Sequence, residues 1–101
     1  MYIYDECQFE WDDNKRRVNL DRHGIDFEDA IAIWEGDVVE VPSAQTRDGE
    51  ERFLAYGQLE GRVICVVFTD RSGRRRIISA RRARDYEREN YKKAIERPAE
   101  G

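Results

Sequence analysis

Cysteine and histidine are scarce in this chain of 101 residues, which contains two cysteines and one histidine. A Cys/His zinc site needs about four ligands, so the chain cannot build one. The single His23 also excludes an acid–base mechanism that uses two histidines of one chain. Cys65 lies in the apolar stretch VICVVF, where a buried thiol is expected, and a disulfide with Cys7 is disfavoured in a reducing compartment. We therefore expect no metal site and no cofactor.

Long apolar runs are also missing, since none approaches the roughly 20 residues that a membrane-spanning helix requires. The opening residues, MYIYDECQFEWDD, are acidic and contain no apolar core of a signal peptide. We therefore expect a cytoplasmic protein with no membrane role. Hydrophobic and charged residues each make up 40% of the chain, which suits one small domain. We place this domain at residues 1–97 and a frayed tail at 98–101.

Apolar patterning and turn residues predict the order β-α-α-β-β-β-β-α. Helices are expected to start near Asp12 or Asp13 and at Asp26, and to end at Gly24 and Gly36. The expected helices cover about 12–22, 26–36 and 83–96; the expected strands cover 2–11, 38–41, 52–57, 62–69 and 74–80, with Pro42 ending the second strand and a polar loop at 43–51. The strand at 62–69 is apolar on both faces, which places it centrally. We predict an α+β domain with a twisted, mainly antiparallel sheet and helices packed on one face.

The stretch RSGRRRIISARRAR, residues 71–84, holds seven arginines and no acidic residue, although the chain has a formal net charge of −4. Alternation along a strand should point Arg74 and Arg76 to one face and Arg75 to the other. Arg81 and Arg82 lie near the start of the last helix, where free N–H groups favour anions. Arginine also binds phosphate bidentately. Three interpretations stay open: a solvated or ion-paired surface, a nucleic-acid site, and a site for an acidic protein partner.

Three segments resemble the BrnT family of bacterial toxins: FEWDDNKRRVNLDRHGIDFEDA, GEERFLAYG and VVFTDRSGRRRIISARRARDYERENY. The resemblance covers about residues 9–91. Its motifs are Trp11-Asp12 with Lys15, Asn19, His23 and Gly24; Glu51-Arg52; and the run from Arg76 to Arg82 with Glu87 and Tyr91.

This resemblance implies a toxin of a type II toxin–antitoxin pair, with a fold related to RelE-type ribonucleases. Such a protein would cut RNA and arrest translation. A BrnA-like antitoxin with a ribbon-helix-helix DNA-binding end would mask it in a hetero-oligomer and repress the shared operon.

RNA cleavage without a metal uses the neighbouring 2′-hydroxyl as nucleophile and needs a base, an acid and cations around the phosphate. Glu87 and Tyr91 lie at i, i+4 on the last expected helix, so they share a face near the arginines. The expected catalytic residues are Lys15, Arg76, Arg81, Glu87 and Tyr91. The expected RNA-binding residues are His23, Arg52, Arg74, Ser79 and Arg82.

Structural alternatives stand beside these roles. Glu87 can instead pair with Arg84 or Arg88, and Tyr91 can belong to the core. His23 can cap the first helix, although an imidazole also suits acid–base chemistry. Ser79 can serve the sheet edge.

A second hypothesis for the whole chain is a non-catalytic module whose arginine face docks the antitoxin and serves operon autoregulation.

Overall fold

A five-stranded sheet organises the chain, and the computed structural model describes residues 8–47 and 49–96. Cys7, the first residues of the expected opening strand and the expected tail lie outside this range. In chain order the elements are β1 (Phe9–Trp11), α1 (Asp13–His23), α2 (Phe27–Ala30), the 3-10 helix η2 (Ile31–Glu35), β2 (Val39–Arg47), β3 (Glu50–Leu59), β4 (Arg62–Arg71), β5 (Arg74–Arg82) and α3 (Asp85–Ile95).

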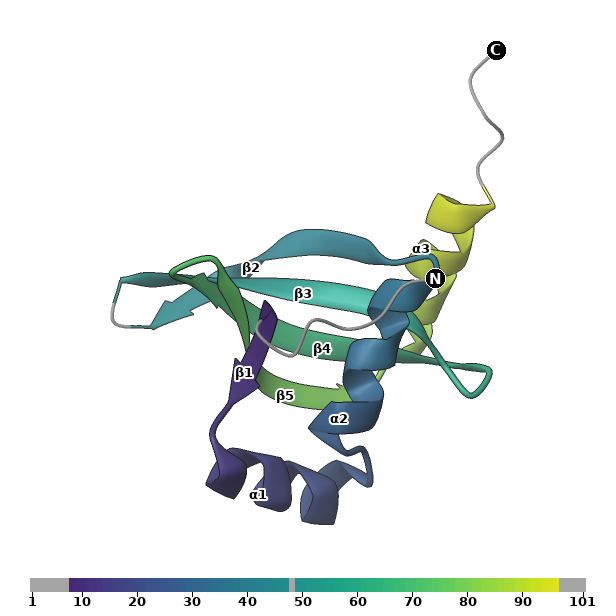
Figure 1. The fold of residues 1–101 in the computed structure, drawn as a ribbon. Coiled ribbons are helices and arrows are strands. Elements are labelled where there is room, and N and C mark those ends of the chain that lie inside the picture. The colour runs from purple at the N-terminus through teal and green to yellow at the C-terminus, as the bar shows by residue number, and fades with distance from the viewer. Residues whose placement is uncertain (1–7, 48, 97–101) are drawn as a thin grey trace.

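The strands lie side by side in the order β1-β5-β4-β3-β2 (Figure 1). β1 runs parallel to β5, and every other pair is antiparallel. The predicted α+β class and mainly antiparallel sheet are confirmed, as is the central place of β4. β4 can occupy the middle because its side chains are apolar toward both faces, so neither face requires water.

Two tight hairpins set the register of the last three strands. Glu60 and Gly61 have φ values of 53° and 79°, and Ser72 and Gly73 have values of 54° and 82°. Two successive left-handed residues form the turn whose twist matches that of paired strands. The predicted turns at both places are confirmed.

Helix boundaries follow the predicted signals closely. α1 follows Asp12 and ends at Gly24, which has a φ of 71° and donates its N–H to the carbonyl of Leu20. Asp26 begins α2 and accepts a hydrogen bond from the Glu28 N–H at 3.1 Å. The sequence predicts one continuous second helix. In the structure this segment is α-helical up to Ala30 and becomes a 3-10 helix from Ile31.

The two faces of the sheet are covered differently. We call the face that carries Ala55, Ile64 and Val66 the front face, and the face that carries Tyr56 and Cys65 the back face; strand alternation separates the two sets. α2 and η2 cover the front face (Figure 1).

α3 packs on the back face instead, because its Glu87 contacts Tyr56 and Arg81 there. The prediction that all helices lie on one face is therefore wrong for α3. The physical reason is that β4 is apolar on both sides, so Cys65 also needs cover.

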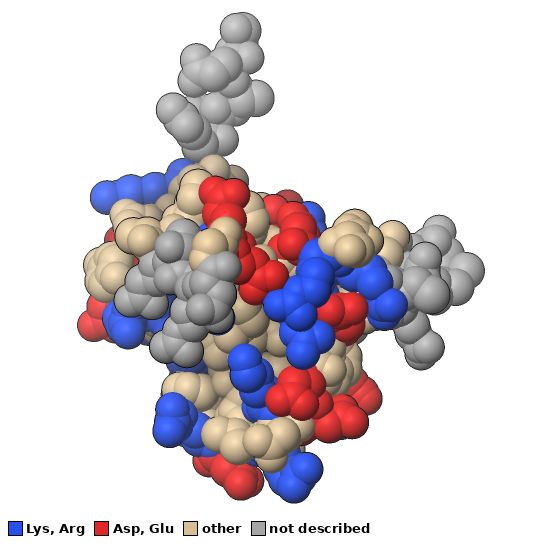
Figure 2. Space-filling model, turned by 90° about the vertical axis from the view of Figure 1, so that its left-hand side faces the viewer, with Lys and Arg blue, Asp and Glu red and all other residues tan. Residues whose placement is uncertain are grey.

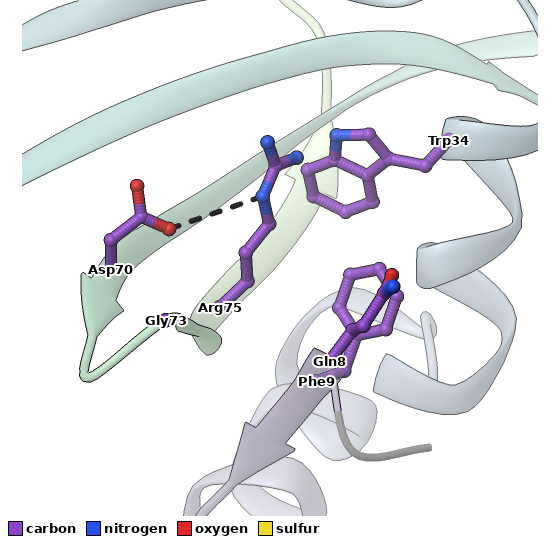
Figure 3. A pocket seen from close by; sticks show the side chains of 6 residues that line it. All are labelled: Gln8, Phe9, Trp34, Asp70, Gly73 and Arg75. Carbon is purple, nitrogen blue, oxygen red and sulfur yellow. Dashed lines mark ion pairs between the residues drawn. The ribbon is translucent and has the colours of Figure 1, made fainter. Parts of the chain in front are cut away.

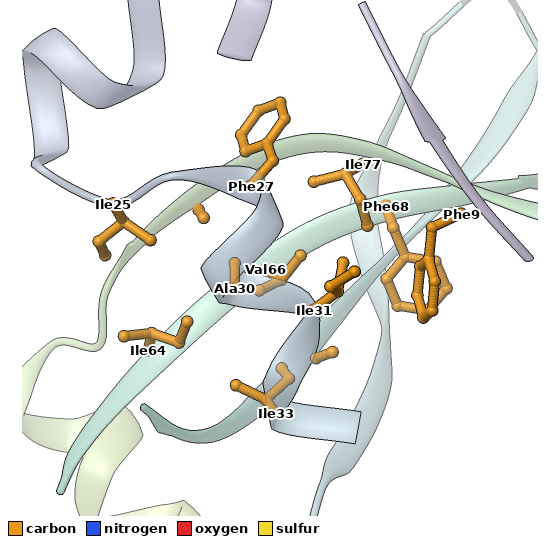
Figure 4. Packing of buried hydrophobic residues seen from close by; sticks show 12 residues of the cluster. Phe9, Ile25, Phe27, Ala30, Ile31, Ile33, Ile64, Val66, Phe68 and Ile77 are labelled. Carbon is orange, nitrogen blue, oxygen red and sulfur yellow. The ribbon is translucent and has the colours of Figure 1, made fainter. Parts of the chain in front are cut away.

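The main core lies between the front face and the helices (Figure 4). Phe27 and Phe68 are fully buried, and Ile31 belongs to the same cluster. Trp34 packs against it partly buried, with its ring centroid 5.4 Å from those of Phe9 and Phe68. Phe27, Ile31 and Trp34 thus pack against the front face of the sheet.

The second strand differs most from its prediction. β2 continues through Pro42 to Arg47, and the expected loop at 43–51 is largely strand. Pro42 is tolerated because β2 is an edge strand, so the missing N–H costs no ladder bond on its open side. The register with β3 shifts between Pro42 and Thr46, as expected for a bulge.

One buried amide attaches α1 to the sheet. Asn19 donates to the carbonyl of Ala80 at 2.9 Å and accepts the Ala80 N–H at 3.1 Å, so its side chain pairs with β5 as a neighbouring strand would. Its amide also donates to the Ile25 carbonyl at 3.0 Å. These bonds give Asn19 a structural role, and Trp11, the other motif residue near it, belongs to β1.

Replacing Gly57 with alanine should destabilise the fold. The added Cβ would lie 2.7 Å from the Ile33 Cβ, which requires the 3-10 helix to move off the sheet. We expect a loss of about 1–3 kcal/mol in the free energy of unfolding, measured with urea. Gly36→Ala is the matched control, because nothing lies within 4 Å of its added Cβ. Equal stability of the two variants would contradict the proposed close packing.

Candidate functional site

Five of the predicted site residues share the back face of the sheet. The strand registers place Arg52, Thr69 and Arg76 in one row, and Val41, Leu54, Val67 and Ser79 in the next. A third row contains Val39, Tyr56, Cys65 and Arg81. Arg74 lies beyond the first row on the same side. The prediction that Arg75 points the other way from Arg74 and Arg76 is confirmed.

Carboxylates from distant elements neutralise much of the arginine run. Five of its seven arginines form ion pairs: Arg71 with Glu50, Arg74 and Arg76 with Glu10, Arg75 with Glu40, and Arg81 with Glu87. On the face that Figure 2 draws, Lys and Arg side chains are interleaved with those of Asp and Glu. The ion-paired interpretation of the run therefore holds for most of its members.

Arg75 illustrates how fully such a side chain is engaged. Its guanidinium lies 5.2 Å from the ring centroid of Trp34 and 5.0 Å from that of Phe68. It also pairs with Glu40 at 2.7 Å and approaches Asp70 at 3.9 Å beside a hollow on the front face (Figure 3). The cation–π contacts and the ion pair together hold the Arg75 guanidinium at the edge of the aromatic part of the core.

Glu87 is the most heavily bonded polar side chain on the back face. Arg81 donates to both carboxylate oxygens, at 2.8 and 3.0 Å. The Tyr56 hydroxyl donates at 2.7 Å, and the Arg84 N–H donates at 2.7 Å. The Glu87 side chain is only 4% exposed, so these contacts replace water. They favour the ion-pair interpretation of Glu87, with Arg81 as the side-chain partner instead of Arg84 or Arg88.

The same contacts shift three acidities. The bonds from Arg81 lower the pKa of Glu87 to about 2, so the carboxylate is ionised at neutral pH. The bond to Glu87 raises the pKa of Arg81. Burial raises the pKa of Tyr56, and its bond to Glu87 adds to that shift. The cluster is therefore one anion held by a cation and a neutral phenol.

Tyr91 lies one helical turn after Glu87 on α3. Tyr91 as a whole is 4% exposed, its hydroxyl donates to the Asp37 carbonyl at 2.8 Å, and burial raises the pKa of that hydroxyl. Tyr91 and Glu87 line a narrow apolar groove between α3 and the edge strand β2. These contacts favour the core interpretation of Tyr91.

A second group of predicted residues converges where α1 meets the edge of β5. Lys15, His23 and Ser79 line one hollow of about 340 Å³ together with Asn14, Val18, Asn19, Arg22 and Ile78. No carboxylate is among these lining residues. Among the residues that the structure describes, Lys15 and Arg22 form no ion pair, so their charges face the hollow unopposed. We call this the α1–β5 hollow.

Several predicted residues lie outside both the Glu87 cluster and the α1–β5 hollow. Arg82 lines a different hollow, which His23 also borders. Arg52 carries a buried Nε without a hydrogen-bond partner. Arg74 lies over the start of β5, where it donates to the Phe9 carbonyl at 3.3 Å.

Sequence patterns did not single out Tyr56, Asn14 or Arg22. Tyr56 sits in an ordinary alternating strand, and its partner Glu87 lies 31 residues away, so no local signal joins them. Arg22 does have a signal, because it lies three residues after Asn19 and seven after Lys15, on the same face of the helix.

The described part of the chain contains no cluster of three or more histidine, cysteine, aspartate or glutamate side chains able to hold a metal ion. Within the same residues, no helix is long and apolar enough to cross a membrane. Cys65 is a buried free thiol.

Comparison with known families identifies the class of this protein. A family model described as "Ribonuclease toxin, BrnT, of type II toxin-antitoxin system" matches residues 11–87, which include the α1–β5 hollow and the Glu87 cluster. The match assigns a ribonuclease toxin of the type II class, and within that class the chain belongs to the BrnT family. Membership implies an RNA target and an antitoxin partner. No curated protein sequence matches the chain.

Replacing Glu87 with glutamine should lower stability in a pH-dependent way. The pKa of Glu87 is lowered from 4.5 to about 2, so its contribution is present above pH 4.5 and is lost as the pH falls toward 2. We expect a loss on the order of 3 kcal/mol at neutral pH, because the variant leaves the Arg81 charge without its partner.

Urea unfolding of both proteins across this pH range measures the effect. The gap between Glu87→Gln and the unaltered protein should shrink toward the acid end. Glu89→Gln, exposed on the same helix, should show no such gap. A gap that is independent of pH would contradict the ion-pair assignment.

Proposed function

We propose that this protein is a metal-independent endoribonuclease that cleaves RNA by attack of the 2′-hydroxyl and thereby arrests translation in the cytoplasm. We further propose that its antitoxin is BrnA-like, with a ribbon-helix-helix DNA-binding end, and that the two form a hetero-oligomer. Family membership supports the ribonuclease class; the chemistry, the site residues and the partner's type are the proposed parts.

The observation that carries this proposal is the α1–β5 hollow. It combines two unpaired cations, three short hydrogen-bonding side chains and the chain's only histidine, without an opposing carboxylate among its lining residues. Such a set suits a phosphodiester, because cations stabilise charge that develops on the phosphate oxygens. We assign Lys15 as the phosphate cation, Ser79 as a phosphate-binding hydroxyl, and His23 as the acid–base group.

The back face extends this site along the sheet. Ser79 belongs both to the hollow and to the row that borders Arg76 and Arg52. We propose that Arg52, Arg74 and Arg76 bind the flanking RNA backbone on this face, and that Arg82 binds it from the front face. Arg81 acts as a cation at the other end of the face, and Glu87 positions its guanidinium through the bidentate pair. Tyr91 holds α3 in place through its bond to Asp37.

The reaction balances within the RNA. The 2′-oxygen loses its proton to the base and bonds to the adjacent phosphorus, while the bond from phosphorus to the 5′-oxygen breaks. The leaving 5′-oxygen takes a proton from the acid. The products are a 2′,3′-cyclic phosphate and a free 5′-hydroxyl, so no metal-bound water is needed as nucleophile.

A non-catalytic antitoxin-binding module is the second candidate. The ion pairs of the arginine run weaken the case for an RNA surface there. The specific observation in favour of the module is the apolar groove between α3 and β2, where Val41 and Tyr86 are exposed, because such a groove suits an amphipathic segment of an antitoxin. Induced expression with and without a neighbouring antitoxin gene, with RNA integrity followed over time, separates the candidates. Tight antitoxin binding by a protein that leaves RNA intact would favour the module.

Cleavage of RNA by the purified protein should persist in EDTA. It should stop when the 2′-hydroxyl at the cleaved bond is replaced by hydrogen, because the nucleophile is then missing. End analysis of the products should find the cyclic phosphate and the free 5′-hydroxyl. Loss of activity in EDTA that Mg²⁺ restores would exclude the proposed mechanism.

Lys15→Ala and Arg76→Ala should each lower the cleavage rate more than the affinity, since a fixed cation acts mainly on transition-state charge. For Lys15→Ala we expect a loss of about 10²-fold in the single-turnover rate. For Arg76→Ala we expect less, because Glu10 already offsets that charge.

The matched control is Arg17→Ala, which removes an exposed positive charge from the same helix as Lys15. It should leave both rate and affinity within about twofold, as for an ordinary surface change. Equal losses in Lys15→Ala and Arg17→Ala would mean that the hollow has no special role.

A further inference from the structure

The second hollow that His23 borders has a different composition from the first. It lies at the front-face side of the same sheet edge, with a volume of about 240 Å³. Its apolar floor comes from Ile25, Leu59 and Ile64, and its remaining lining residues are Gly24, Asp26, Asp29, Glu60, Arg62 and Arg82. We call it the Arg62–Arg82 hollow.

Its two arginines are available for a ligand. Arg82 lies directly opposite Ile64, and Arg62 is two residues before Ile64 on the same strand, so both side chains leave the front face beside each other. Within the described residues, neither arginine forms an ion pair. This contrasts with Arg71 to Arg76, whose charges carboxylates offset.

The carboxylates of this hollow are not equivalent. Asp26 is engaged, because Arg16 donates to both of its oxygens at 2.8 and 3.0 Å and the Glu28 N–H bonds it too. Asp29 and Glu60 are exposed and form no ion pair among the residues described. Two acceptors thus face two cations over an apolar floor.

A bare phosphate would not suit this mixture, since Asp29 and Glu60 would repel it. A nucleotide would suit it. The arginines match its phosphate, the apolar floor matches a base ring, and carboxylates accept hydrogen bonds from the exocyclic amino groups of bases. Because His23 borders both hollows, a strand seated in the α1–β5 hollow would continue here within one or two nucleotides.

We propose that the Arg62–Arg82 hollow binds the RNA nucleotide beside the cleaved bond and prefers a base that carries an exocyclic amino group. Arg62 and Arg82 hold its phosphate, and Asp29 and Glu60 read its base. This inference rests on the proposed ribonuclease function and assigns it a specificity site.

Binding of uncleavable RNA tests the phosphate contacts. The probes are short 2′-O-methyl oligonucleotides of A, C or U, and the dissociation constant is measured by fluorescence anisotropy at several salt concentrations. Arg62→Gln and Arg82→Gln should each weaken binding of all three probes about fourfold at 0.15 M salt and reduce the salt slope by about 0.7. Lys92→Gln, which removes an exposed charge from α3, should change neither.

The same probes test the base contacts. The unaltered protein should bind the A and C probes about fivefold more tightly than U, since U has no exocyclic amino group. The double variant Asp29→Asn and Glu60→Gln should lose this preference. Its salt slope should stay unchanged, because no phosphate contact is removed.

Two outcomes overturn the inference in distinguishable ways. If Lys15→Gln weakens binding while Arg62→Gln and Arg82→Gln behave like Lys92→Gln, the ribonuclease proposal stands and the hollow is not part of the RNA site. If the double variant Asp29→Asn and Glu60→Gln still binds the A and C probes more tightly than U, then Asp29 and Glu60 do not recognise the base. If the unaltered protein binds none of the probes, both the inference and the proposed function fail.

Discussion

A single buried carboxylate determines how the last helix joins the sheet. An ionised carboxylate removed from water must find donors, and Glu87 finds them in β3, in β5 and at the start of its own helix. Because Arg81 and Tyr56 belong to different strands, α3 can satisfy Glu87 in only one position. A narrow apolar groove lies beside Glu87, between α3 and β2. Apolar contact is non-directional, so the hydrogen bonds of Glu87 set the orientation of α3 on the sheet.

The same principle explains how an acidic chain carries an arginine-rich strand. Each early arginine of the run meets a carboxylate that is far away in the sequence, from β1, β2 or β3. Pairing across strands neutralises the end of the sheet near the β4–β5 hairpin. Among the described residues, the unpaired cations that line the two hollows bordered by His23 are Lys15, Arg22, Arg62 and Arg82, around α1 and the far end of β5. The sequence shows the whole arginine run but not which of its members carboxylates from other strands neutralise, because those carboxylates are far away along the chain.

This contrast shows what the sequence could predict. Local signals were reliable: the turn at Ser72-Gly73 and the helix end at Gly24 depend on φ preferences of a few adjacent residues. The strand through Pro42 was missed because tolerance of proline depends on being at a sheet edge, which is a tertiary property. The face chosen by α3 was missed for the same reason. In the site, the expected residues Lys15, His23 and Ser79 do converge, whereas the partner of Glu87 could not be read from helix spacing.

The helix that carries Lys15 and His23 is attached in an unusual way. α1 buries only Asn19, while its apolar residues Val18 and Leu20 are 49% and 41% exposed. Hydrophobic contact is non-directional and would leave the rotation of such a helix loosely set. The paired hydrogen bonds between Asn19 and Ala80 are directional, so they fix which side of α1 faces β5. Lys15 and His23, one turn before and after Asn19, are thereby aimed at Ser79. α1 therefore buries little apolar surface, but its hydrogen bonds to β5 define the orientation of the side chains that line the α1–β5 hollow.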